Sequence, residues 1–201
     1  AGMIRLAERD GVSLGNVSAF NGPITITTGG TTGIGSVSSG TDAERLEGAR
    51  VIITSGSDDK LQRARQLGAD VTINYRQHPD WHLQVLANTA GQGVDHVIEV
   101  GGSGTLEKSC IACKVSGRIS LIGVLTGYPE TNPSPYLILA KRLTLQGIAV
   151  GSREMFEAMN RAMVAHDIKP VIDREFSFSQ VQEAYDHLQR GEHFGKVVIV
   201  R

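Results

Sequence analysis

Short runs of β-branched residues alternate with longer helical patterns from residue 23 to residue 150, and this alternation is the strongest constraint on the fold. Such an order is typical of a parallel sheet wound with helices. We expect strands at residues 23–27, 49–54, 71–74, 94–100, 117–123 and 143–150. Six strands suffice for a complete nucleotide-binding sheet, so the predicted fold class is α/β with a doubly wound parallel sheet.

The intervals between these strands carry helix start and stop signals. Ser57 or Asp58 can cap a helix that ends at Gly68, where a glycine favours the left-handed stop. Two further helices are expected at residues 79–91, with Pro79 in the first turn, and at residues 104–113.

After Val150 the pattern changes to helix, strand, helix, strand, at residues 152–166, 168–176, 179–189 and 196–200. Ser179 with Gln182 forms a capping-box pattern at the start of the last helix. The expected organisation is a lead-in, a dinucleotide-binding domain and a C-terminal extension, at residues 1–22, 23–150 and 151–201.

Charge and composition argue against several function classes. The 201 residues include 20 Lys and Arg against 21 Asp and Glu, without a basic cluster, which disfavours nucleic acid and anionic membranes as partners. The first ten residues carry four charges, and no apolar run approaches the length of a membrane span. Two cysteines cannot build a disulfide framework. We expect a soluble, cytoplasmic protein.

A glycine-rich segment, "TTGGTTGIGS" at residues 27–36, follows the first expected strand. Gly33, Ile34 and Gly35 begin a G-x-G-x-x-G pattern in which a serine takes the third glycine position. Such glycines let the backbone approach a pyrophosphate, and the next helix N-terminus attracts the anion. The pattern predicts a phosphate loop, with a plain turn as the alternative. The helix after it is weakly marked, because residues 40–41 are Gly and Thr.

The second expected strand ends without the acidic residue that binds the ribose hydroxyls of NAD. The segment "TSGSDDK" offers hydroxyls at Ser55 and Ser57 and a cation at Lys60. A pocket of this kind suits a 2′-phosphate, so the residues favour NADP over NAD. Asp58 and Asp59 are interpreted as first-turn acids of the following helix.

The loop "TGGTTGIG" resembles that of short-chain dehydrogenases, a family that implies a catalytic Tyr-x-x-x-Lys pair. The sequence lacks this pair. Tyr136 and Lys141 are one residue too far apart, and the other tyrosines have no lysine four residues later. A short-chain enzyme is therefore not expected.

From residue 49 to its end the chain resembles the medium-chain dehydrogenase/reductase superfamily, in particular zinc-type alcohol dehydrogenases and quinone oxidoreductases. The resemblance is carried by "GARVIITSGSDDKLQRARQLGAD", "INYR", "GVDHVIEVGGSGTLEKS", "GRISLIGVLTG", "KRLTLQGIAVGSREMFEAMNRAM" and "PVIDREFSFSQVQEAYDHLQRGEHFGKVVI". It implies a Rossmann-like sheet and hydride transfer between nicotinamide and an alcohol, aldehyde, ketone or quinone. At the adenosine end it implies Ser55, Lys60 and Tyr75. Beside the nicotinamide it implies, mainly through backbone groups, Val100, Gly101, Ile122, Gly123, Val124, Ile148 and Val150.

The same resemblance implies a separate catalytic domain that carries the zinc ligands, and the residues before Thr27 leave no room for it. We therefore expect no catalytic residue and no metal ligand in this chain, and no activity without that domain, on which residues 151–201 pack in relatives. The strand at residues 143–150 resembles the one through which family members dimerise, which implies a homodimer. The alternative is a degenerate binding or assembly module without bound cofactor.

Two cysteines, two histidines and one glutamate resemble parts of metal or catalytic sites, but we interpret them as structural or surface residues. Cys110 and Cys113 form C-x-x-C, expected one turn apart on one helix, but no second pair completes a zinc site. His78 and His82 have ligand-like spacing and are interpreted as a solvated helix start. Glu99 is a lone carboxylate at a strand end, which is no acid/base pair.

Overall fold

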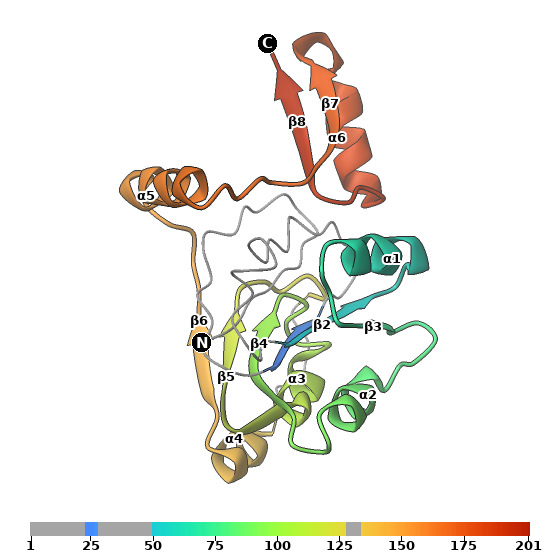
Figure 1. The fold of residues 1–201 in the computed structure, drawn as a ribbon, viewed down its shortest axis with the longest axis vertical. Helices are drawn as coiled ribbons and strands as arrows, with labels where there is room; N and C mark the ends of the chain where they lie inside the picture. Colours follow the sequence, from blue (N-terminus) through green and yellow to red (C-terminus); the bar gives the residue numbers. More distant parts are fainter. Residues whose placement is uncertain (1–22, 28–49, 128–133) are drawn as a thin grey trace.

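Six parallel strands form one sheet in the computed structural model, which describes residues 23–27, 50–127 and 134–201 (Figure 1). The strands are β1 (Pro23–Thr27), β2 (Arg50–Ser55), β3 (Val71–Asn74), β4 (Val94–Glu99), β5 (Cys113–Leu121) and β6 (Thr144–Gly147). Their order is β3-β2-β1-β4-β5-β6, with a reversal between β1 and β4. This is the doubly wound arrangement of dinucleotide-binding sheets, so the predicted fold class is confirmed. The lead-in and the glycine loop with Gly33, Ile34 and Gly35 lie outside the described residues.

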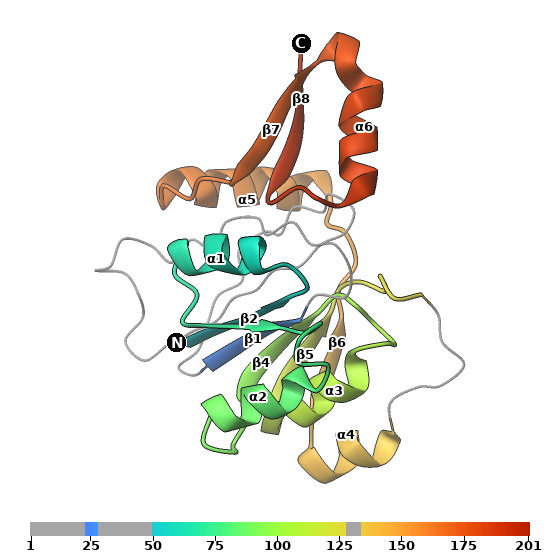
Figure 2. The same cartoon turned by 90° about the vertical axis from the view of Figure 1, so that its right-hand side faces the viewer.

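Helices cover both faces of the sheet (Figure 2). Helix α1 (Asp58–Gln66) packs on one face, and α2 (Trp81–Asn88), α3 (Leu106–Ala112) and α4 (Pro135–Lys141) pack on the other. Because side chains alternate along a strand, Ile53 joins the core under α1 and its neighbour Ile52 joins the core under α2 and α3.

Helix α1 begins and ends where the sequence predicts. Ser57 Oγ accepts a hydrogen bond from Lys60 N at 3.4 Å, and Asp58 and Asp59 occupy the first turn. Gly68 follows the helix with a φ of 102°, a conformation that suits glycine. The cap and stop residues were therefore readable from sequence alone.

Three local predictions were wrong. Helix α2 starts at Trp81 after Asp80, so Pro79 precedes the helix instead of lying in its first turn. Strand β5 already begins at Cys113, so the two cysteines do not share a helix. The capping box at the C-terminal helix is made by Ser177 and Gln180, two residues earlier than expected.

The C-terminal residues follow the predicted order of helix, strand, helix, strand. They form α5 (Arg153–Ala165), β7 (Ile172–Ser177), a 3-10 turn η1 (Phe178–Gln180), α6 (Val181–Arg190) and β8 (Lys196–Val200). Strands β7 and β8 pair in parallel as a separate sheet, and we call residues 172–200 the C-terminal unit. Its Phe194 packs into the core cluster under α1, so the division at residue 150 stays a prediction.

The longest helix of the described part of the chain is α5, with 13 residues. None of the helices in that part has both the length and the apolar character needed to cross a bilayer.

Candidate functional site

The residues that the resemblance assigns to the nicotinamide end follow the carboxyl ends of the sheet strands. Thr27, Glu99, Leu121 and Gly147 are successive register partners across β1, β4, β5 and β6, so these strands end level with one another. Just beyond these ends come, in pairs or short runs, Val100 and Gly101, Ile122 to Val124, and Ile148 and Val150. The structure thus brings them to one edge, at the reversal of strand order where ligands bind to such sheets.

The loops after β4 and β5 are bound tightly to each other. Thr126 Oγ1 donates to Gly101 O at 2.8 Å and accepts from Gly104 N at 2.8 Å. A Cβ on Gly123 would lie 2.6 Å from Val100 O. Because that approach is closer than side chains tolerate, the glycine is required for the two loops to form one wall.

The wall and the segment after β6 present backbone and a few exposed apolar side chains. Val100 is 2% exposed, so its side chain belongs to the core, and its carbonyl accepts from Leu125 N at 3.2 Å. Val124 and Ile148 are each 43% exposed, and Val150 is 88% exposed. Such a surface suits a flat ring, because the ring can pack against the apolar side chains while its polar groups bond to the backbone.

Glu99 at the end of β4 is fully buried and faces the start of α3. Gly102 N donates to Glu99 Oε1 at 2.9 Å, Thr105 Oγ1 donates to the same atom at 2.6 Å, and Ser109 Oγ donates to Oε2. Burial raises the pKa of Glu99, against the opposing effect of these hydrogen bonds. Glu99 therefore fastens the loop after β4 to α3.

At the end of β2, Ser55 is 1% exposed and Ser55 O accepts from Tyr75 N at 3.1 Å. A Cβ on Gly56 would lie 2.7 Å from Arg76 Nε and 3.0 Å from two ring carbons of Tyr75. The structure therefore brings Ser55 and Tyr75 together and adds the guanidinium of Arg76. Sequence reasoning missed Arg76, although it closes the segment "INYR" that pointed to Tyr75.

Asp58 does not act at this end of the sheet as a ribose ligand would. Its carboxylate accepts from Asn74 Nδ2 at 2.8 Å and from Gln77 Nε2 at 2.9 Å, which ties α1 to the segment after β3. The predicted first-turn role of Asp58 and Asp59 is confirmed.

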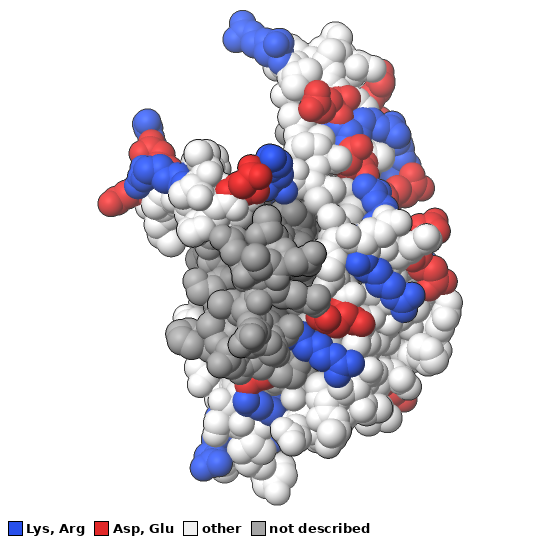
Figure 3. Space-filling view, in the orientation of Figure 1, with Lys and Arg blue, Asp and Glu red and all other residues white. Residues whose placement is uncertain are grey.

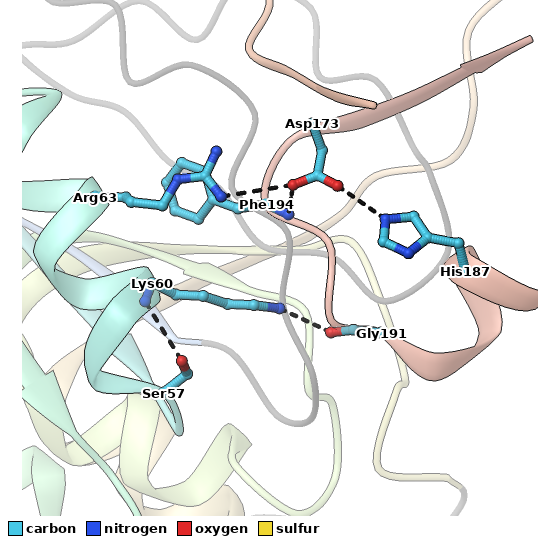
Figure 4. Close-up of polar contacts among 7 residues, drawn as sticks. All are labelled: Ser57, Lys60, Arg63, Asp173, His187, Gly191 and Phe194. Carbon is cyan, nitrogen blue, oxygen red and sulfur yellow. Dashed lines mark hydrogen bonds and ion pairs between the residues drawn. The ribbon is translucent and has the colours of Figure 1, made fainter. Parts of the chain in front are cut away.

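Lys60 points away from the end of β2. Its Nζ donates to Gly191 O in the turn after α6 at 2.8 Å (Figure 4), and the residue is 7% exposed. Burial lowers the pKa of Lys60 to about 8, and the nearby Asp173 carboxylate opposes this shift. A contact between Lys60 and a 2′-phosphate stays a prediction. It requires the Lys60 ammonium to give up its hydrogen bond to Gly191 O and to bind the phosphate instead.

Asp173 of β7 organises the contact between α1 and the C-terminal unit (Figure 4). It accepts from Phe194 N at 2.9 Å, its Oδ2 lies 2.9 Å from His187 Nε2, and Arg63 of α1 lies 3.5 Å from its Oδ1. The Arg63 guanidinium also lies 4.1 Å above the centre of the Phe194 ring. Burial raises the pKa of Asp173, but the hydrogen bonds and cations outweigh it and the net pKa is lowered.

The described residues do not fit a zinc site. No group of three His, Cys, Asp or Glu side chains in them could hold a metal ion. Burial raises the pKa of Cys110 to about 11 and that of Cys113 to about 12, which disfavours the thiolate form of both side chains. His78 is exposed as expected, whereas His82 is only 8% exposed, so its interpretation as solvated was wrong.

Positive and negative side chains are interspersed over the face drawn in Figure 3. Lys, Arg, Asp and Glu alternate along α1 and the C-terminal unit there, without a continuous stripe of one sign among the coloured residues. This face therefore has mixed charge.

Known proteins resemble the chain over most of its length. It is 43% identical over 155 residues to a zinc-type alcohol dehydrogenase-like protein of Schizosaccharomyces pombe, covering 76% of this chain and 45% of that protein. It is 31% identical to an L-threonine 3-dehydrogenase of Symbiobacterium thermophilum, covering 93% and 55%. A crystal structure of an NAD-dependent alcohol dehydrogenase is 33% identical with a TM-score of 0.69, covering 79% of this chain and 46% of that one.

The chain spans about half the length of these relatives. The family model for zinc-binding dehydrogenases matches residues 41–165, which is more than half of the chain and includes five of the six strands of the large sheet. With the sheet order and the site at its carboxyl edge, this match leads to one conclusion: the chain belongs to the zinc-binding dehydrogenase family, within the medium-chain dehydrogenase/reductase superfamily.

Proposed function

We propose that this chain binds NADP(H) across the carboxyl edge of its six-stranded sheet, as the cofactor-binding part of an oxidoreductase. The observation that carries the proposal is the level ending of β1, β4, β5 and β6 at the reversal of strand order. The cofactor supplies hydride chemistry between its nicotinamide and an alcohol, aldehyde, ketone or quinone. This chain supplies position: the wall formed by residues 100–104 and 122–126 supports the nicotinamide end, and no catalytic residue is proposed.

The preference for NADP(H) over NAD(H) is supported by the charges at the end of β2. Ser55 stands where a ribose-binding carboxylate would be expected, and the nearby Asp58 carboxylate is already held by Asn74 and Gln77. Arg76 supplies a guanidinium beside Gly56, a group that binds phosphate well. Lys60, in the first turn of α1, is a second cation. NAD(H) is the competing choice, since a relative with 33% identity is NAD-dependent.

A titration of the purified chain with NADPH and NADH, followed by nicotinamide fluorescence, tests both parts of the proposal. We expect NADPH to bind on the order of tenfold more tightly than NADH, the effect of one charge-assisted contact of about 1.4 kcal/mol. Arg76→Met should remove most of this preference, and Arg118→Met, an exposed arginine in β5, is the matched control. No binding of either cofactor at millimolar concentration would support the alternative, a binding or assembly module without cofactor.

We also propose a homodimer that pairs residues 143–150 of two chains. Strand β6 is an edge of the six-stranded sheet, and Ile148 and Val150 leave apolar surface exposed beyond it. An unpaired edge of this kind favours pairing with another chain. Sedimentation velocity should give a dimer, whereas a monomer at high concentration would contradict this.

A further inference from the structure

Among the described residues, Lys60 joins α1 to the C-terminal unit through one hydrogen bond of its ammonium group. The side chain is 7% exposed, and Nζ donates to a backbone carbonyl that lies 131 positions further along the chain. An ammonium has three N–H donors, and the partner that the described residues supply is neutral. Burial accordingly lowers the pKa of Lys60 to about 8. A buried cation with a neutral acceptor gains free energy from an anionic partner.

The acceptor lies in a turn that depends on this hydrogen bond. Gly191 ends α6 in the left-handed conformation, with a φ of 63°, and is buried. In the same turn His193 is 1% exposed, and neither of its ring nitrogens has a partner among the described residues. Removing the Lys60 donor would leave Gly191 O as another buried polar atom without a partner. Such an atom destabilises its surroundings.

The backbone of Lys60 lies close to the end of β2. Its amide donates to Ser57 Oγ at 3.4 Å, which places it in the first turn of α1, next to Ser55 and Gly56. Lysine has a flexible four-carbon stem, so its ammonium can turn from the C-terminal unit towards this end of the sheet. A phosphate dianion there would be a stronger acceptor than Gly191 O.

We propose that Lys60 couples the dinucleotide site to the C-terminal unit: the Gly191 carbonyl and the 2′-phosphate of NADP(H) compete for its ammonium, so that binding of NADP(H) loosens residues 172–200. The coupling rests on the proposed NADP(H) site and adds a structural response to it. NADH, which has no 2′-phosphate, leaves the Lys60–Gly191 hydrogen bond in place. Arg63 keeps its contacts with Asp173 and Phe194 in both cases, so the unit loosens without leaving α1.

The direct test compares two small probes that differ only by the phosphate in question, 2′,5′-ADP and 5′-AMP. Each is added to the purified chain at saturation, established by calorimetry, and amide hydrogen exchange is followed by mass spectrometry. Peptides from residues 191–200 should exchange on the order of tenfold faster with 2′,5′-ADP than with 5′-AMP, the factor for a lost buried hydrogen bond. Peptides from β4 and β5 should not differ. NADPH and NADH should reproduce the contrast.

A pair of lysine variants locates the effect. Lys60→Met keeps the length of the side chain without the charge, so residues 191–200 should exchange fast in every condition and respond to neither probe. Lys169→Met is the matched control, because Lys169 is an exposed lysine paired with Asp167, and it should respond as the unchanged chain does.

The possible failures are distinguishable. If 2′,5′-ADP binds and the exchange of residues 191–200 matches that with 5′-AMP, the coupling is wrong and the proposed function stands. If calorimetry detects binding of neither probe nor NADPH, both proposals are wrong. Should Lys60→Met not fold, the comparison of the two probes on the unchanged chain decides alone.

Discussion

The six-stranded sheet and the C-terminal unit are both parallel sheets of this chain, yet different contacts hold them. The large sheet has helices on both faces, and Ile52, Ile53, Val97 and Ile119 are each 0% exposed. The C-terminal unit has two strands, and α5 before it buries no residue. Its position depends on Phe194 and on polar contacts of Lys60, Arg63 and Asp173. The comparison teaches that apolar burial stabilises one region, whereas a few polar contacts position the other.

The two regions should respond very differently to loss of the same side chain. Ile119→Ala, in β5 of the large sheet, should lower the free energy of unfolding by about 2–5 kcal/mol, because the site cannot fill the cavity. Ile199→Ala, in β8, should cost less than about 1 kcal/mol, because Ile199 is 39% exposed. Urea denaturation measures both. Equal costs would contradict the comparison, since they would mean that β8 is as well packed as β5.

Loss of Asp173 should affect the C-terminal unit alone. Asp173→Asn should destabilise that unit by about 1–3 kcal/mol, because Phe194 N and His187 lose a charged acceptor. Amide exchange should accelerate in β7 and β8 and stay unchanged in β4 and β5. The exposed Glu175 of the same strand is the control, as Glu175→Gln should change neither region. Faster exchange throughout the chain would mean that both regions unfold together.

The same variant should remove a pH dependence. The pKa of Asp173 in the folded chain is lower than its ordinary value of 3.8. The contribution of Asp173 to the stability of the fold is therefore complete above pH 3.8, and it is lost as the pH falls through the pKa of the folded state. The protection of β7 and β8 should therefore decrease in acid below about pH 4 in the unchanged chain. In the Asp173→Asn variant this decrease should be absent.

Ionisation of Glu99 in the large sheet should change stability with pH in the opposite direction to ionisation of Asp173, and by a smaller amount. Burial raises the pKa of Glu99 above 4.5 in the folded chain. The contribution of Glu99 to the stability of the fold is therefore complete below pH 4.5, and it is lost as the pH rises through the pKa of the folded state. Glu99→Gln keeps an acceptor for Gly102 N and cannot ionise, so the free energy of unfolding of this variant should rise relative to that of the unchanged chain as the pH increases above about 4.5. Urea denaturation at several pH values is the measurement, and a difference that does not change with pH would mean that folding does not raise the pKa of Glu99.

Local signals made much of the fold predictable. Runs of β-branched residues located all six strands of the large sheet, and Ser57 and Gly68 marked the ends of α1. Helix α4 was missed because the segment "PYLILA" has no charged residue, so its sequence shows no helical alternation of apolar and polar residues. Contacts with distant parts of the chain fix this helix. Its own Lys141 ammonium donates to the carbonyls of Cys110 and Ile111 at 3.0 Å and 2.7 Å, and to that of Cys113.

The candidate site was predictable where chain order determines position. The resemblance to medium-chain dehydrogenases implied Val100, Ile122 and Ile148, and these residues follow strands of a parallel sheet, so they must meet at its carboxyl edge. The charges at the adenosine end were not predictable in this way. Arg76 reaches Gly56 from a different loop, and the partner of Lys60 is the backbone of Gly191, whose carbonyl no residue type identifies.

The hydrogen bonds between Thr126 and the backbone of Gly101 and Gly104 have a kinetic consequence. They join the segments after β4 and β5, so neither can swing outward while the other stays in place. Under the proposed NADP(H) binding, a dinucleotide meets a surface already in its final shape on this side, so its association is not delayed by rearrangement of these two segments. Any motion that admits or releases the cofactor then involves other segments, which makes the rate of cofactor release a property of those segments.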